Sequence, residues 1–333
     1  MPTRLRHLPR AAFAAAAAAF ALIQACTLSQ AQDWPAKPVR IVSPFAAGGS
    51  SDLVGRLLAE KLSERLGQQF FLENRGGAGG LIGTAAVAGA APDGYTFMIS
   101  SIGTHVTSPV SSANPGYDPI GNFTHVAFIG GPPTVIAVHP SLNVRSFAEL
   151  RALLKGSAAP TPYVSPGPGT VGNLLAEFWA ERDNFTLAHV AYKGSGQAMN
   201  DLVAGHVRLA SLTWSAARGQ MRGGTIIPLA VSSAQRMPEF PDVPTLKELG
   251  YPELMVTTWF GIAAPAALPG PILHRMNAEI GQTLETAAVR ERLVAEGFEL
   301  GRMSPAEMTR FVQAEISKWS PLTKRAMSSD PGK

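Results

Sequence analysis

The stretch that decides the fold is VRIVSPFAAGGSSDLVGRLLAEKLSERLG, residues 39–67. Its apolar beginning, VRIVSPF, has the composition of a short buried strand. After the turn PFAAGGSSD, leucines recur at helical spacing from Leu53 to Leu66, and Gly67 is a typical residue to end a helix. The stretch therefore predicts a strand, a glycine-rich turn and a helix in succession.

The same succession of elements recurs along the chain. QFFLEN and YTFMISS predict two further strands, separated by the glycine-rich RGGAGG and a helix of small residues. Ser146 and Glu149 fit a capping box at the start of a helix. TPYVSPGPGTVGNLLAEFWAE again predicts a strand, a turn and a helix, and two helices are expected near the C-terminus, from 271 and from 304. This alternation predicts an α/β fold with mainly parallel sheets.

Residues 1–31 have the pattern of a cleaved signal peptide. A basic start is followed by the apolar run AAFAAAAAAFALI, which is short for a membrane span, and by SQA, which fits a cleavage site after Ala31. We therefore expect export to the periplasm. A membrane anchor is one alternative, and lipoprotein anchoring at Cys26 is another. Cys26 is the only cysteine, so the mature chain should contain no disulfide.

Composition limits the class of partner. With 333 residues, 46% hydrophobic and 16% charged, the chain is long and apolar enough for two folded domains. The leader holds three of the 28 basic residues and no acid, so the mature chain nearly balances its 24 acids. The basic pI therefore does not indicate a nucleic-acid partner.

The turn PFAAGGSSD lacks the patterns of two common chemistries. A phosphate-binding P-loop needs a Lys after its glycines, and none follows here. GGAGG, residues 76–80, lacks the acidic residue that a dinucleotide site places about 20 positions on. GGSSD does not match the G-x-S-x-G pattern of a nucleophilic serine. No metal-binding motif is present, so we expect no cofactor.

Anion binding without chemistry fits the turn better. A helix N-terminus offers unpaired N–H groups and a partial positive charge, and glycines let a ligand approach the backbone. Ser50 and Ser51 add hydroxyl donors, and Asp52 suits the first turn of the helix. A single turn of this kind could be purely structural. A second one, SPGPGTVGNL, lies in the other half of the chain, and the pair indicates a cleft with a helix N-terminus on each wall.

Several segments together resemble the Bug-type (TctC-like) substrate-binding proteins of tripartite tricarboxylate transporters. They run in the family's order from WPAKPVRIVSPFAAGGSSDLVGRLL through GTHV, HVAYKGSGQAMNDLVAGHV and PLAVSSAQRMPEFPDVPTLKELG to WFGIAAP. The resemblance implies a periplasmic, two-lobed binding protein of type II-like fold that holds a small carboxylate between its lobes. We expect one lobe from residues 33–134 plus 255–333 and the other from residues 135–254.

The resemblance also implies which residues contact the ligand. Backbone N–H groups, hydroxyls and bridging waters are expected to do so, rather than an arginine. Tyr192 and Gly194 should lie near the site. The predicted ligand-binding residues are Phe45, Ala46, Ala47, Gly48, Gly49, Ser50, Ser51, Ser101, Gly103, Thr104, His105, Ser165, Gly167, Gly169, Thr170, Lys193, Thr213 and Trp214.

The chain departs from the family pattern in its second half. Val171 and Asn173 follow the second turn, where the family often has a polar residue and a histidine. Leu212 and Thr213 stand where the family often has Asp-Asn. Because the acid that could meet a ligand ammonium is missing, we expect a carboxylate without an amino group. Its far end could be apolar and contact Trp214 and Trp259, although a tryptophan in such a position is more often simply part of the core.

The sequence thus predicts a non-catalytic, monomeric receptor that delivers a carboxylate to membrane permease subunits. A secreted α/β hydrolase and a ligand sensor for a signalling partner are the alternatives.

Overall fold

The computed structural model describes residues 34–328. The predicted signal peptide and Cys26 lie outside the described residues. The helices and strands described below all lie after residue 36 and belong to one compact unit. In the part that is described, no helix combines the length and the apolar character needed to cross a membrane.

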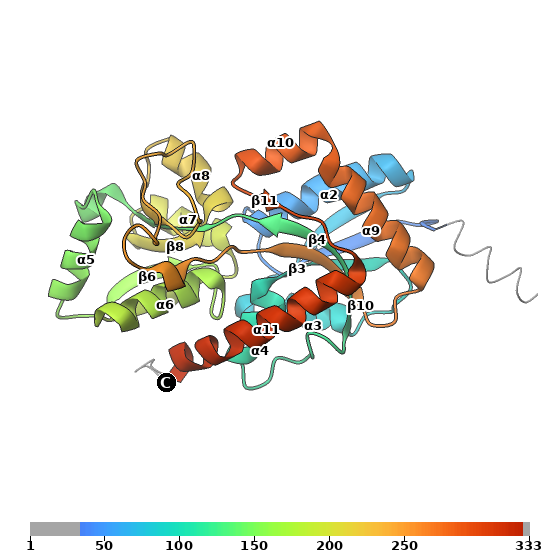
Figure 1. The fold of residues 1–333 in the computed structure, drawn as a ribbon, viewed down its shortest axis with the longest axis horizontal. Coiled ribbons are helices and arrows are strands. Elements are labelled where there is room, and N and C mark those ends of the chain that lie inside the picture. The colour runs from blue at the N-terminus through green and yellow to red at the C-terminus, as the bar shows by residue number, and fades with distance from the viewer. Residues whose placement is uncertain (1–33, 329–333) are drawn as a thin grey trace, which may run out of the picture. The chain divides into compact units, whose positions relative to one another are not determined.

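The first sheet has six strands in the order β11-β4-β10-β3-β1-β2. Figure 1 shows α2, α9 and α10 on one side of this sheet and α3, α4 and α11 on the other. The strands are β1 (Val39–Ser43), β2 (Phe70–Asn74), β3 (Thr96–Ser101), β4 (Phe123–Gly131), β10 (Phe260–Pro265) and β11 (Glu299–Leu300). The helices are α2 (Ser50–Leu66), α3 (Leu81–Ala88), α4 (Ser108–Ser111), α9 (Gly270–Glu285), α10 (Ala287–Ala295) and α11 (Pro305–Ser328), with the short turns η1 (Ala78–Gly80) and η2 (Gly103–Thr107), the latter a π-helix.

The second sheet has five strands in the order β7-β6-β8-β5-β9 and is buried on both faces. In β5, Ile136 and Val138 pack toward α5 and α6, and Val135 and Ala137 pack toward α7 and α8, as the alternation of a strand requires. The strands are β5 (Thr134–Val138), β6 (Thr161–Ser165), β7 (Leu187–Ala191), β8 (Leu209–Thr213) and β9 (Ile227–Val231). The helices are α5 (Phe147–Gly156), α6 (Val171–Asp183), α7 (Ser195–Val203) and α8 (Trp214–Arg222), with the short turns η3 (Pro140–Leu142) and η4 (Pro252–Leu254).

The α/β class is confirmed, but both sheets are mixed rather than mainly parallel. Strands that are connected through helices run parallel. In the first sheet β1 pairs with β2 and β3, and in the second sheet β6 pairs with β7 and β8. Strands next to the connections between the sheets pair antiparallel, namely β10 with β3 and β4, and β5 with β8 and β9. The direction of these strands depends on where the chain crosses from one sheet to the other, which the local pattern does not encode.

Two extended segments connect the sheets. Pro132 and Pro133 join β4 directly to β5. The chain returns to the first sheet through residues 232–259, called the return segment, whose last residues pair with these two prolines. Thr258 N–H donates to Pro132 O over 3.0 Å, and Thr257 forms an antiparallel bridge with Pro133. The prolines cannot donate, so the return segment supplies the donor. The division into two lobes, residues 33–134 plus 255–333 and residues 135–254, stays a prediction.

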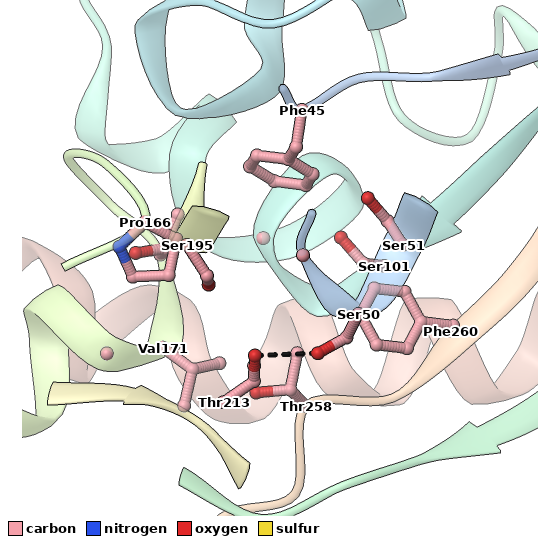
Figure 2. Close-up of a pocket in the computed structure, with 14 residues that line it drawn as sticks. Phe45, Ser50, Ser51, Ser101, Pro166, Val171, Ser195, Thr213, Thr258 and Phe260 are labelled. Carbon is pink, nitrogen blue, oxygen red and sulfur yellow. Dashed lines mark hydrogen bonds between the residues drawn. The ribbon is translucent and has the colours of Figure 1, made fainter. Parts of the chain in front are cut away.

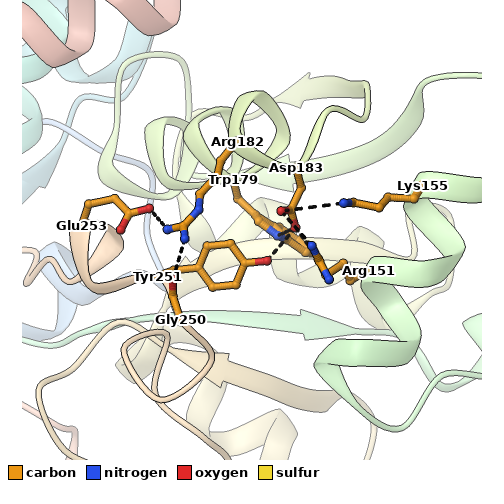
Figure 3. A network of polar contacts seen from close by, with 8 residues as sticks. All are labelled: Arg151, Lys155, Trp179, Arg182, Asp183, Gly250, Tyr251 and Glu253. Carbon is orange, nitrogen blue, oxygen red and sulfur yellow. Dashed lines mark hydrogen bonds and ion pairs between the residues drawn. The ribbon is translucent and has the colours of Figure 1, made fainter.

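A network of polar contacts holds the return segment against the second sheet's helices (Figure 3). The buried Asp183, the last residue of α6, accepts hydrogen bonds from Arg151 Nε (2.7 Å), Trp179 Nε1 (3.1 Å) and Tyr251 Oη (2.6 Å). Arg182 beside it pairs with Glu253 at the surface and lies over the Tyr251 ring. A buried carboxylate with three donors thus fixes the path of the chain between β9 and β10.

Candidate functional site

A cavity lies between the two sheets and is lined from both (Figure 2). Of the described residues that line it, none carries a charge: the wall consists of hydroxyls, glycines and apolar groups. The lining residues are Phe45, Gly49, Ser50, Ser51, Ser101, Gly103, Pro166, Thr170, Val171, Gly172, Ser195, Thr213, Thr258 and Phe260.

Four helices begin at this cavity. α2 starts at Ser50, α6 at Val171, α7 at Ser195, and α8 directly after Thr213. In none of these four helices does the N-cap side chain accept a bond from the first turn. Each N-terminus carries roughly half a positive charge and N–H groups without a partner in the helix. The cavity therefore offers anion-binding donors although the described residues of its lining include no cationic side chain.

Most of the hydroxyls on the cavity wall are held by neighbouring groups. Ser50 Oγ donates to Thr213 Oγ1 over 2.6 Å, which joins the N-termini of α2 and α8. Ser51 Oγ lies 2.8 Å from Ser43 Oγ, and Thr170 Oγ1 donates to Gly167 O over 2.7 Å. These bonds orient the hydroxyls and keep them in place on the wall.

The loops from the two sheets contact each other at the edge of the cavity. Ala46 N–H donates to Lys193 O over 2.8 Å. A Cβ atom at Gly79 would lie 2.1 Å from Pro168 O, so only glycine permits this approach. Both predicted glycine-rich turns line the cavity, the first with Gly49, Ser50 and Ser51 and the second with Pro166 and Thr170.

Asp52 holds the loop that precedes α2 by accepting a hydrogen bond from its backbone. Its Oδ2 accepts from Gly48 N–H (3.1 Å) and from Arg56 Nε (3.0 Å). Burial alone would raise the pKa of Asp52, but hydrogen bonds from Arg56, Gly48 and Asn74 and the attraction of Arg56 together lower it. The carboxylate thus stays charged and holds the Gly48 loop without lining the cavity, in agreement with its predicted place in the first turn.

The structure places the predicted ligand-binding residues in two groups. Those on the cavity wall are Phe45, Gly49, Ser50, Ser51, Ser101, Gly103, Thr170 and Thr213. Those that do not line it are Ala46, Ala47, Gly48, Thr104, His105, Ser165, Gly167, Gly169, Lys193 and Trp214. Several of the second group support the loops through the backbone, as Lys193 does with its carbonyl while its side chain is exposed.

His105 is fully buried behind the cavity wall. Its Nδ1 lies 3.0 Å from Thr104 Oγ1, and its ring contacts Phe123 and His125. Burial, together with repulsion from His125, holds the pKa of His105 well below its usual value. Thr104 Oγ1 in turn accepts from Ser101 N–H (3.0 Å), so the neutral imidazole supports the wall residue Ser101 rather than reaching the cavity itself.

The two tryptophans that could have formed an apolar end of the site lie in the core. Trp214 packs against Phe240 on the α7–α8 side of the second sheet, and Trp259 donates from Nε1 to Glu315 (3.0 Å) and contacts Phe311. The rings of Phe45 and Phe260 line the cavity instead.

Six lining residues are not among the predicted ligand-binding residues: Pro166, Val171, Gly172, Ser195, Thr258 and Phe260. Ser195 could have been found, because YKGSG is a third glycine turn before a helix. Thr258 and Phe260 give no local signal, since only the pairing of the return segment brings them to the cavity.

Three solved structures resemble this chain closely. Rpa4515 from R. palustris, solved with adipate, is 35% identical with a TM-score of 0.85, covering 88% of this chain and 98% of that one. The periplasmic binding protein BugD is 32% identical with a TM-score of 0.84 and the same coverage. MatC from Rhodopseudomonas palustris, with bound malate, is 29% identical with a TM-score of 0.81, covering 87% of this chain and 100% of that one.

The sequence signature described as "Tripartite tricarboxylate transporter family receptor" matches residues 54–327, which include the four helices that begin at the cavity except for the first turn of α2. On this match, and on its similarity to BugD, the chain belongs to the TctC family of periplasmic solute-binding receptors.

Proposed function

We propose that this chain captures a small organic carboxylate in the cavity between its sheets and presents it to a tripartite tricarboxylate-type membrane transporter. The observation that carries the proposal is the convergence of four helix N-termini on a cavity whose described lining residues include no charged side chain. A carboxylate bound there receives charge-assisted hydrogen bonds from backbone N–H groups and hydroxyls. The adipate and malate of the solved relatives belong to the same chemical class.

The ligand that fits this wall has no ammonium group. No acid is among the described residues that line the cavity, so a buried ammonium would lack a counter-charge. The rings of Phe45 and Phe260 suit a hydrocarbon portion between polar ends. We therefore expect a carboxylate with an apolar body and no amino group.

Binding without chemistry agrees with the surroundings of the wall serines. Ser50 Oγ contacts the hydroxyls of Thr213 and Ser215, and no imidazole belongs to the described lining of the cavity. A serine nucleophile needs a base within hydrogen-bond reach. Turnover of a carboxylic ester that Ser50→Ala abolishes would contradict this part of the proposal.

Capture is proposed to proceed by closure of two lobes, residues 33–134 plus 255–333 and residues 135–254, about the two connecting segments. A ligand that contacts the N-termini from both sheets binds the closed arrangement more tightly than an open one, which shifts the population toward closure.

Calorimetry on the exported chain (residues 32–333) tests the proposal. The panel holds mono-, di- and tricarboxylates, aspartate and glutamate, and inorganic phosphate and sulfate. We expect one-to-one binding of a carboxylate without an amino group. Ser195→Ala removes a hydroxyl from the wall and should weaken that binding about fivefold, the contribution of one modest hydrogen bond.

The matched control is Ser317→Ala, which removes an exposed serine of α11 far along the chain from every lining residue. Its affinity should equal that of the unmodified chain. Tightest binding of aspartate, glutamate or phosphate would overturn the proposed ligand class, and equal affinity of the Ser195→Ala variant would argue against this cavity as the site.

A further inference from the structure

Thr258 is fixed in position by its backbone. Its N–H donates to Pro132 O over 3.0 Å, and its neighbour Thr257 bridges to Pro133. Gly131 packs directly against it, because a Cβ atom at that glycine would lie 1.8 Å from Thr258 O. The direction of the Thr258 side chain is therefore set by the paired connecting segments and not by a bond of its own hydroxyl.

The hydroxyl of Thr258 is buried on the cavity wall without a partner. The residue is only 9% exposed and lines the same cavity as Thr213 (Figure 2). Within residues 34–328, no group forms a hydrogen bond with its Oγ1. Ser50, Ser51 and Thr170 on the same wall all have hydroxyl or carbonyl partners. A buried hydroxyl without a partner costs free energy, so its place in the cavity calls for a ligand group that bonds to it.

We propose that Thr258 is a specificity-determining residue that bonds a second oxygen function of the ligand, distinct from the carboxylate held at the helix N-termini. This inference rests on the proposed function. A ligand that places hydrocarbon against Thr258 leaves the hydroxyl of Thr258 without a hydrogen bond. A site that hydrogen-bonds the correct ligand discriminates against a ligand that lacks the bonding group. A second carboxylate, a hydroxyl or a carbonyl oxygen of the ligand forms the hydrogen bond that the Thr258 hydroxyl lacks.

Two pairs of probes measure this discrimination in the unmodified chain and in Thr258→Val. Adipate and hexanoate differ by one carboxylate, and malate and succinate differ by one hydroxyl. We expect the unmodified chain to bind at least one oxygen-bearing member more tightly than its partner. Thr258→Val should reduce that preference about tenfold while leaving the affinity for the poorer member unchanged. Thr258→Ser should restore the preference, because it keeps the hydroxyl.

The variant is suited to the test because valine has nearly the shape of threonine. Removing an unpaired buried hydroxyl should leave the thermal midpoint of the ligand-free protein equal or higher, so a loss of affinity cannot be ascribed to unfolding. Thr257→Val is the matched control, since Thr257 is the adjacent threonine of the same segment and does not line the cavity. Its affinities should be those of the unmodified chain.

The results separate this inference from the proposed function. If the unmodified chain discriminates within a pair and Thr258→Val discriminates equally, the role of Thr258 is wrong and the receptor function stands. If the unmodified chain binds an oxygen-bearing probe no more tightly than its partner in either pair, the inference is also wrong. If none of the four probes and no carboxylate of the wider panel binds, the proposed function fails and this inference fails with it.

Discussion

At the scale of single residues, Asp52 connects the stability of the chain to pH. The carboxylate accepts from Gly48 N–H and Arg56 Nε, and its pKa in the folded chain is lowered below 3.8. A lowered folded pKa means that the carboxylate stabilises the fold above the unfolded pKa and that this contribution is lost as the pH falls through the folded pKa. Asp52→Asn should therefore cost about 1–2 kcal/mol at pH 7 and distinctly less near pH 3.

Urea denaturation at the two pH values measures this difference. Asp242→Asn is the control, because Asp242 is exposed and forms no hydrogen bond or ion pair with the described residues. It should change the free energy of unfolding little at either pH. A cost of Asp52→Asn that is the same at pH 7 and pH 3 would show that the charge of Asp52 does not stabilise the turn.

At the scale of elements, the contacts at the end of α6 allow a buried carboxylate to be compared with an exposed ion pair. Asp183 is buried and accepts from Arg151, Trp179 and Tyr251, whereas both partners of the adjacent Arg182–Glu253 pair are exposed. Asp183→Asn should lower the free energy of unfolding by about 2 kcal/mol, because it removes the charge of a buried carboxylate that accepts three hydrogen bonds. Arg182→Met should lower it by less than about 1 kcal/mol, as for other surface pairs.

Guanidinium denaturation of the two variants measures the two losses of unfolding free energy. Arg182 and Asp183 are adjacent residues of α6, so each variant serves as the control for the other. Because Tyr251 belongs to the same network, Tyr251→Phe in the Asp183→Asn background should cost less than Tyr251→Phe alone. Equal costs for Asp183→Asn and Arg182→Met would indicate that the network does not fix the return segment.

The elements differ in how far the sequence could predict them. The unit from Val39 to Gly67 was predicted because its signals are local: an apolar run, a glycine turn, helical spacing and a glycine that ends the helix in the left-handed conformation (φ 68°). α8 and α10 were missed, since WSAARGQMR and AAVRERLVA have no cap that stands out. The sequence predicts mainly parallel sheets, whereas both sheets are mixed, because the direction of the antiparallel strands follows from long-range crossings.

At the scale of the whole molecule, some residues that line the cavity have a local signal in the sequence and others do not. The sequence predicts Ser50, Ser51 and Thr170 on the cavity wall because each lies where a glycine-rich turn meets a helix, which is a local pattern. Thr258 and Phe260 reach the wall only because the return segment pairs with Pro132 and continues into β10 between β3 and β4. Contacts made across such a sequence separation leave no pattern in a single sequence.

The proposed closure of the two lobes can be tested with a disulfide between them. A Cβ atom at Gly49 would lie 3.7 Å from the Cβ of Ser195, within the range of about 3.5–4.5 Å that a disulfide needs. Gly49 has φ −99°, which any residue adopts, so cysteine is tolerated there. The only natural cysteine, Cys26, lies in the predicted leader, so a chain expressed without residues 1–31 contains no competing thiol.

The double variant Gly49→Cys, Ser195→Cys should therefore oxidise readily, and a bound carboxylate should speed oxidation because it favours closure. Oxidation before ligand is added should prevent binding, and reduction should restore it; oxidation with ligand present should trap the ligand through gel filtration. Either single cysteine variant, treated alike, should keep reversible binding. If the oxidised double variant exchanges ligand as fast as the reduced one, the loops need not separate, and entry by opening of the two lobes is wrong.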